Sequence, residues 1–491
     1  MISANLPALQ VVLPLLSAPF CLLFRWNWFS YSIALIASWL AFVVSIELLT
    51  VVLATGPISY RMGGWAPPFG IEYVVDIVNA YVLLIVSAIG ALVITFGKQS
   101  VERELPAGKD GLFYTAYLLC LAGLLGVTIT GDAFNIFVFL EISSLSSYVL
   151  ISLGRQPMAL TAAYRYLVLG TIGATFYLIG VGLLYQATGT LNIADLAVRV
   201  PELTENRSVR AAFAFMTVGI GIKLALFPLH IWLPNAYAYA PSVSSAFLAA
   251  TATKVSIYVL IRVFYTIFGP AFSFETLPLD WVLLPLAIIA MFVGSTVAIF
   301  QVDMKRMLAY SSVAQIGYMV VGISLVSVLG MTGGLLHLFN HALMKGALFL
   351  AMGCIFYRIG SVAVDDLDGL GRRMPWTMAA FVIGSLSLIG VPLTAGFVSK
   401  MYLILAAWDK DWWWLAGLIV FSSLLAIIYV WRIIEVAYLR DPPEGSEVKE
   451  APLSLLFPAW VLALANIYFG IDTRLSVGVA ENAAKFLLGA N

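Results

Sequence analysis

Long apolar runs, separated by short polar connections, recur along the whole chain. Most runs are about 20 residues long or longer, which is the length that a helix needs to cross a hydrocarbon core of roughly 30 Å. The pattern therefore predicts an all-α membrane protein with about fourteen transmembrane helices. The predicted spans are residues 4–24, 30–54, 74–96, 112–130, 133–153, 163–187, 210–228, 242–266, 277–300, 306–328, 332–357, 375–402, 412–438 and 452–470.

The composition agrees with this pattern and limits which partners and cofactors the chain can have. Hydrophobic residues make up 62% of the 491 residues and charged residues only 11%, whereas a soluble protein carries about 25% charged residues. The net charge of zero argues against a nucleic-acid partner. The three cysteines lie far apart, each in an apolar run, and no connection is long enough to fold around a redox group. We therefore expect no cofactor and no metal site.

The basic residues of the connections are distributed unevenly. Connections after odd-numbered spans carry about fourteen, Lys305 among them, and connections after even-numbered spans carry about six, including Arg262. The positive-inside rule therefore predicts that the odd-numbered connections are cytoplasmic and that both termini lie on the outer side.

Five ionisable residues remain inside apolar runs rather than in connections: Glu141, Lys223, Lys254, Lys345 and Lys400. A charge at that depth costs several kcal/mol unless it is paired or hydrated, so these residues indicate function. A lysine near the end of a span can instead extend to the membrane surface. That alternative is strongest for Lys400 and weakest for the other three lysines.

Glu141 lies about ten residues into the fifth predicted span, where a carboxylate must be protonated, paired or hydrated. Lys223 is its natural partner, because it also lies near the middle of a span. We predict that the two form a pair whose separation favours proton release from the lysine. The alternative is an ion pair that only packs two helices together.

The seventh and twelfth predicted spans each combine a helix breaker with a lysine, Pro228 with Lys223 and Pro392 with Lys400. They are five spans apart, and a repeated unit of five crossings must be inverted, because an odd number of crossings reverses direction. Interrupted helices at matching positions of inverted halves point to a transport site.

The eleventh predicted span, within residues 332–358, carries His337, His341 and Lys345. These residues are four apart and therefore lie on one helix face, along roughly 12 Å of the membrane interior. Histidines titrate near the working pH, which suits a proton relay. A zinc site is one alternative, although no third ligand is evident. Neutral histidines hydrogen-bonded to Ser, Thr or Asn340 are another.

Several long segments resemble one membrane-protein family. They are GDAFNIFVFLEISSLSSYVLI around Glu141, KLALFPLHIWLPNAYAYAPSVSSAFLAATATK from Lys223 to Lys254, KRMLAYSSVAQIGY from Lys305, HLFNHALMKGALF from His337 and PLTAGFVSK ending at Lys400. The chain resembles the antiporter-like, proton-conducting subunits of Mrp cation/proton antiporters, respiratory complex I and membrane-bound hydrogenases. Its length, the form of the fifth span, the segment WAPPFGIEYVVDIVNA and lysine at position 400 look most like the D-type subunits of Mrp antiporters.

The resemblance implies two inverted five-helix repeats, formed by spans four to eight and nine to thirteen. The predicted segments are a three-helix segment at 1–110, the first repeat at 111–268, the inverted repeat at 269–440, and a C-terminal helix and tail at 441–491. The family's coupling pair matches Glu141 and Lys223, its connecting lysine Lys254, and its distal lysine Lys400. Gln315 stands where some relatives have histidine.

We therefore expect a proton-translocating subunit of a multi-subunit Na⁺/H⁺ antiporter in the plasma membrane of a prokaryote. Its expected partners are other membrane subunits, protons, Na⁺ and lipid. The main alternative is the same module in a redox-driven complex, either complex I-like or a hydrogenase. A membrane scaffold without transport is less favoured, because it gains nothing from buried charges. A stand-alone solute transporter is also less favoured.

Overall fold

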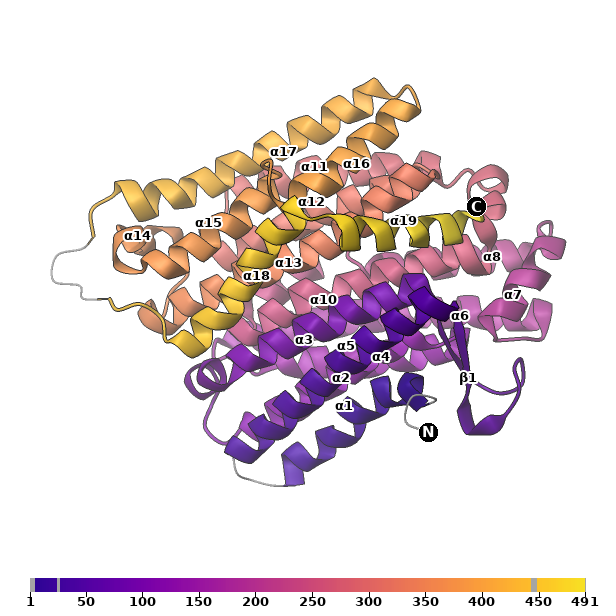
Figure 1. Cartoon of the computed structure of the whole chain (residues 1–491), viewed down its shortest axis with the longest axis horizontal. Coiled ribbons are helices and arrows are strands. Elements are labelled where there is room, and N and C mark those ends of the chain that lie inside the picture. Colours follow the sequence, from indigo (N-terminus) through magenta and orange to yellow (C-terminus); the bar gives the residue numbers. More distant parts are fainter. Residues whose placement is uncertain (1–4, 24–26, 443–447, 491) are drawn as a thin grey trace.

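The computed structural model describes residues 5–23, 27–442 and 448–490, and nearly all of this part of the chain is helical (Figure 1). The first half forms α1 (Leu6–Leu23), α2 (Asn27–Thr55), β1 (Ile58–Arg61), β2 (Glu72–Val75), α3 (Ile77–Glu104), α4 (Asp110–Ile129), α5 (Ala133–Ser152), α6 (Pro157–Thr188), α7 (Ile193–Arg199), α8 (Arg207–Lys223), α9 (Trp232–Tyr239) and α10 (Ser242–Ile261), which a π-helical turn (Arg262–Ile267) prolongs. The second half forms α11 (Asp280–Ile299), α12 (Met304–Ser324), α13 (Val328–Ile359), α14 (Leu370–Arg373), α15 (Pro375–Ile389), α16 (Ala395–Asp409), α17 (Trp413–Ile434), α18 (Leu453–Ile471) and α19 (Arg474–Leu488).

Twelve helices in the described ranges are long and apolar enough to cross a membrane. They coincide with twelve of the predicted spans, so the prediction of a polytopic helical membrane protein is confirmed. The other two predicted spans are the interrupted ones, formed by α8 with α9 and by α15 with α16. The total of fourteen crossings and the inverted repeats stay predictions.

Both interruptions fall where the helix breakers predict them. The first follows Lys223, where Ala225 adopts a left-handed φ of 61°, and the chain becomes helical again at Trp232. The second follows Ile389, where Gly390 has a φ of 91°. Each break frees carbonyl groups that must find other donors, because lipid offers none. The indole of Trp232 donates to the Ile222 carbonyl at 2.9 Å, which satisfies one of them.

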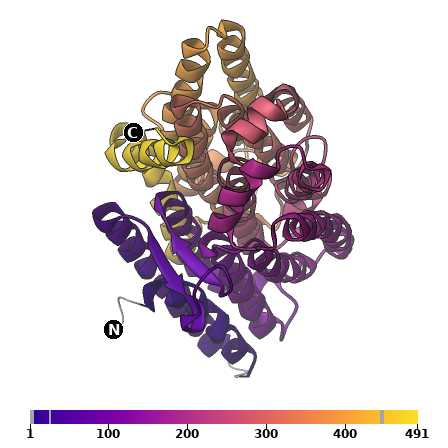
Figure 2. The ribbon, with the colours of Figure 1, turned by 90° about the vertical axis from the view of Figure 1, so that its right-hand side faces the viewer.

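The centre of the molecule is formed by α10 and α13. Every residue of α10 except Ala252 is buried, and so is α13 from Gly330 to Ile355. Helix α13 packs against α3, α10, α12, α15, α16, α18 and α19. Figure 2 shows the C-terminal helices beside the N-terminal ones, so the two ends of the sequence cover one flank of this centre. In such a position a polar side chain on α10 or α13 faces protein rather than lipid.

Several elements were not predicted: the short helices α7 and α14, a β-hairpin and α19. A β-hairpin pairs β1 with β2 between α2 and α3, and it occupies the first two residues of the predicted third span. The carboxylate of Asp76 then caps α3 by accepting from the backbone of Val78 and Asn79. At the other end of the chain, α19 follows α18 and packs against α3 and α13.

Two basic residues that were counted as loop residues are buried instead. Arg262 donates to both carboxylate oxygens of Asp76, at 2.6 and 2.5 Å, and also to the Tyr258 hydroxyl at 3.0 Å. Lys305 is only 4% exposed. The assignment of these two residues to exposed connections was therefore wrong. The π-helical prolongation of α10 carries Arg262 inside the molecule, and α12 begins at Met304, one residue before Lys305.

Candidate functional site

The structure brings Glu141 of α5 and Lys223 of α8 together. The Lys223 amine lies 3.5 Å from Glu141 Oε1 and donates a hydrogen bond of 2.6 Å to the Ser144 hydroxyl. At an effective dielectric of about 20, two unit charges at this separation attract each other by about 5 kcal/mol. The Lys223 side chain is 4% exposed and that of Glu141 is 23% exposed. The pair therefore has a buried cationic end and an acidic end that reaches the surface of this chain.

Lys254 lies in the middle of α10 and is completely buried. Its amine donates to the carbonyl of Ala249 on the same helix. Among the described residues it forms no salt bridge. An ammonium group in this position has only polar partners, so its charge depends strongly on the charges of its neighbours.

Lys345 of α13 is equally buried, and its amine points to α12. It donates to the Leu308 carbonyl at 2.7 Å and to the hydroxyl of Ser311. Because α10, α12 and α13 pack against one another, Lys345 belongs to the same interior as Lys254. Its hydroxyl partner can both donate and accept a hydrogen bond, as a proton relay requires.

The two histidines of α13 differ in their partners. Their rings are stacked with an interplanar angle of 2° and centroids 6.3 Å apart. His337 is satisfied at both nitrogens, by Ser399 at 2.9 Å and Gln315 at 2.8 Å. Both nitrogens of His341 are buried without a hydrogen-bond partner among the described residues. The interpretation as a satisfied neutral histidine therefore fits His337 and fails for His341, which can still accept or donate a proton.

No third His, Cys, Asp or Glu joins these histidines in the described part of the chain. The donor set present there is two imidazoles, amines and hydroxyls. Amines and imidazoles that lie in line exchange protons more readily than they bind zinc, which prefers four thiolate, imidazole or carboxylate ligands.

Lys400 of α16 closes the series. Its amine donates to the carbonyls of Leu388 and Ile389, at 3.0 and 2.9 Å, and lies 4.8 Å from the centre of the Tyr318 ring. The side chain therefore turns inward to the break after α15 and does not extend to the membrane surface. The lysine itself binds these two carbonyl groups, which have no helical partner because α15 ends there.

The helices that carry these residues pack in an unbroken series. Helix α8 contacts α10, α10 contacts α13, and α13 contacts α16, while α5 joins α8 through the Glu141–Lys223 pair. We call the seven residues on this series the buried axis: Glu141, Lys223, Lys254, His337, His341, Lys345 and Lys400. It holds four amines and one carboxylate, so protonation of one lysine disfavours protonation of the next.

Most contacts along the axis were not predicted from the sequence. Ser144, Ser311, Ser399 and Tyr318 all contact an axis residue. Ser144 could have been found near the pair, because it lies one helical turn after Glu141. Each of the four lies on a different helix from the residue that it contacts, so spacing along one helix carries no information about these contacts.

Comparison with known proteins identifies the group to which this arrangement belongs. Residues 130–426 match the family model described as NADH:quinone oxidoreductase/Mrp antiporter, TM. The chain belongs to this family. The matched region contains the whole buried axis, and the predicted family is confirmed.

Relatives of both named types cover nearly the whole chain. The chain is 42% identical to the N subunit of the NADH-quinone oxidoreductase of Desulforudis audaxviator, over 96% of each chain. It is 33% identical to the D subunit of the Na(+)/H(+) antiporter of Alkalihalophilus pseudofirmus, over 95% of this chain and 94% of the relative. A chain of the Mrp complex from Dietzia sp. DQ12-45-1b superposes with a TM-score of 0.91 at 26% identity, covering 99% of this chain and 98% of that one. The superposition covers nearly the whole of both chains, so the family fold is the fold described above.

Proposed function

We propose that this chain is the proton-translocating subunit of a multi-subunit Na⁺/H⁺ antiporter. The observation that carries the proposal is the contact of 3.5 Å between Glu141 and Lys223, at the start of a packed series of buried amines and imidazoles. A transporter of protons needs groups that gain and lose them inside the membrane, and the axis consists of such groups.

Proton transfer along the axis is driven by changes in the charges of neighbouring residues. When Glu141 binds a proton, the carboxylate becomes neutral and the attraction of about 5 kcal/mol on the Lys223 ammonium disappears. Lys223 then releases its proton, which leaves a neutral amine, and the neutral amine of Lys254 becomes an ammonium group. The new charge disfavours a proton on Lys345, so the proton there passes to His341 and His337 and on to Lys400.

Access from the two sides is proposed at the two breaks. Backbone groups that leave a helix inside a membrane are tolerated only beside protein or water. The break after Lys223 lies beside the first amine, and the break after Ile389 lies against the last. One break serves as entry and the other as exit.

The acidic end of the axis is where we propose coupling to a partner subunit. Glu141 is the member that reaches the surface of this chain, so a cation or an ionisable residue of a neighbouring subunit can act on it directly. The relatives named as Na(+)/H(+) antiporter subunits favour Na⁺ as the exchanged cation and the plasma membrane of a prokaryote as the location. Both termini on the outer side follow from the distribution of basic residues.

A second candidate is the same module in a redox-driven complex. The identity of 42% with the N subunit of an NADH-quinone oxidoreductase favours it. In that case the chemistry belongs to other subunits, and this chain translocates protons by the same axis. In either case the chain acts as a transporter subunit rather than as the catalytic subunit of an enzyme.

One experiment separates the two candidates. The complete complex is purified through this chain, and everted vesicles that contain it are given either Na⁺ or a soluble electron donor. Antiport predicts that Na⁺ dissipates a preformed pH gradient without a donor, and that only membrane subunits co-purify. Proton movement that requires the donor, with iron–sulfur subunits in the preparation, would contradict antiport and support the redox-driven complex.

A further inference from the structure

A polar cavity lies at one end of the molecule, outside the buried axis and away from both breaks. Its volume is about 440 Å³. It is enclosed by the end of α3, the turn before α6, the turn between α9 and α10, the start of α12 and the end of α13. This is the end that the positive-inside rule predicts to be cytoplasmic. A cavity of this size and polarity accommodates on the order of ten water molecules.

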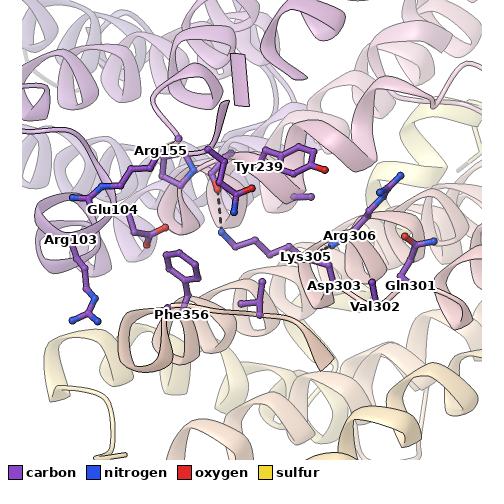
Figure 3. Close-up of a pocket in the computed structure, with 17 residues that line it drawn as sticks. Arg103, Glu104, Arg155, Tyr239, Gln301, Val302, Asp303, Lys305, Arg306 and Phe356 are labelled. Carbon is purple, nitrogen blue, oxygen red and sulfur yellow. Dashed lines mark hydrogen bonds between the residues drawn. The ribbon is translucent and has the colours of Figure 1, made fainter. Parts of the chain in front are cut away.

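A carboxyl group and an amino group face each other in this cavity. Figure 3 shows the carboxylate of Glu104 and the amine of Lys305 turned toward the same space, while Arg103 and Arg306 point away from it. Glu104 is 6% exposed and Lys305 is 4% exposed. In the described ranges neither of the two forms a salt bridge. Each is therefore a buried ionisable group that forms no ion pair within the described residues.

Glu104 connects the cavity to α10. Its carboxylate accepts hydrogen bonds from the Ser100 hydroxyl at 2.5 Å and from the backbone N–H of Ser242 at 2.8 Å. Ser242 is the first residue of α10, the helix that carries Lys254, and its own hydroxyl is buried without a partner among the described residues. The carboxylate of Glu104 therefore lies at the N-terminus of α10, the helix that carries Lys254 in the middle of the axis.

Lys305 connects the cavity to α12. Its amine donates to the Ala240 carbonyl at 3.1 Å and lies 5.2 Å from the centre of the Phe356 ring. About one and two turns further along α12, Leu308 and Ser311 bind the amine of Lys345. One turn after Ser311, Gln315 binds His337. Residues three or four apart share a helix face, so one stripe of α12 runs from the cavity to the axis.

We propose that this cavity is a proton port that exchanges protons between the solution and the middle of the buried axis, with Glu104 and Lys305 as its proton-binding residues. The proposal rests on the proposed function, and it adds a route that passes through neither break. A hydronium ion in the cavity gives its proton to the Glu104 carboxylate and becomes water. The resulting carboxylic acid gives that proton to a neutral Lys305, and the Lys305 ammonium gives one to a neutral Lys345. Every group except Lys345 then returns to its starting state.

The route makes the port selective for protons. A proton passes along it by transfer between the side chains of Glu104, Lys305 and Lys345, whereas a Na⁺ ion cannot be carried by such transfers. The other ionisable residues that line the cavity, and so influence its pH dependence, are Arg155 before α6, Tyr239 of α9 and Asp303 before α12, together with Arg103 and Arg306, whose charged ends point away from it.

Proton flux in everted vesicles that contain the complete complex tests the port. Glu104→Gln keeps an oxygen that accepts from the Ser242 N–H, and its amide NH2 donates to the Ser100 hydroxyl, but it cannot bind a proton as a carboxylate does. Lys305→Arg keeps a donor to Ala240, but arginine does not release a proton at these pH values. We expect each to lower the flux at least tenfold in an assembled complex. Glu104→Asp should restore flux with a shifted pH profile. Glu205→Gln, at a carboxylate that is 86% exposed, is the matched control and should leave flux unchanged.

Glu141→Gln is measured in parallel to separate the port from the proposed function. Flux within twofold of wild type in both Glu104→Gln and Lys305→Arg, together with loss of flux in Glu141→Gln, would overturn the port alone. Retained flux in Glu141→Gln would overturn the proposed function.

A second readout does not depend on transport. The native cysteines are buried, so Ala238→Cys at the cavity wall provides a new thiol. The port predicts its rapid modification by a membrane-impermeant reagent added outside everted vesicles. Protection from that side overturns the port.

Discussion

Lys400 donates a hydrogen bond of 2.9 Å to the carbonyl of Ile389, the residue at which α15 ends. The last proton carrier of the axis is thereby attached to the backbone of the break beside it. An ammonium group has three donors and a neutral amine has two, so the charge on Lys400 and the geometry of the break depend on each other.

This relationship predicts the effect of removing the donor. Lys400→Met leaves the carbonyls of Leu388 and Ile389 buried without a partner, at a cost of about 1–3 kcal/mol for each group. We expect a lower melting temperature of the purified protein and loss of proton flux. Lys400→Arg should keep most of the stability and still lose flux. A melting temperature of Lys400→Met equal to that of wild type would show that other donors replace the lysine.

The two histidines should respond differently to substitution. His337→Phe leaves the Gln315 side-chain oxygen without its partner, which costs about 1–3 kcal/mol, while the Ser399 hydroxyl still donates to the Gly396 carbonyl at 3.1 Å. His341→Phe removes no hydrogen bond, so we expect little loss of stability but strong loss of flux. Thermal unfolding and flux of the two variants, measured side by side, check this. Equal destabilisation by both changes would contradict the assigned hydrogen bonds.

The buried pair of Asp76 and Arg262 should be a large contributor to stability. Asp76→Asn leaves the Arg262 charge buried without a counter-charge, and breaking such a pair costs about 3–5 kcal/mol. The double variant Asp76→Asn with Arg262→Met removes both charges, keeps an oxygen that caps α3, and should recover much of the loss. Denaturation of the purified protein measures both. Asp472→Asn removes the solvent-screened pair with Arg474 and should change stability far less than Asp76→Asn does. A similarly small effect of Asp76→Asn would contradict the burial of the pair.

Much of the axis could be predicted, because a membrane makes buried charge conspicuous. Lys254 and Lys345 have long apolar flanks, so no connection could hold them. Pro228 and Pro392 marked the breaks, since each removes a backbone donor and strains the preceding turn. These signals are local and need no knowledge of which helices touch.

The cavity residues could not be predicted in this way. Glu104 and Lys305 lie near the ends of helices, where a charged residue is ordinary. Their significance comes from α3, α10 and α12 meeting at one end of the molecule, which apolar periodicity does not encode. Arg262 was misassigned for a similar reason, because a π-helical turn carries it inward and its partner Asp76 is far away in sequence. The Asp76–Asn79 capping box, in contrast, was readable from the sequence and would have placed the start of α3 correctly.

The most direct test of the buried axis is proton and Na⁺ flux in everted vesicles that contain the complete complex, compared between wild type and Glu141→Gln. The variant keeps the size of the side chain and a hydrogen-bond acceptor for Lys223, but it removes the charge that holds the Lys223 ammonium at 3.5 Å. We predict that both fluxes fall at least a hundredfold while the complex stays assembled. Both fluxes at wild-type levels in an assembled complex would contradict a proton path along the axis and would leave these residues with a structural role only.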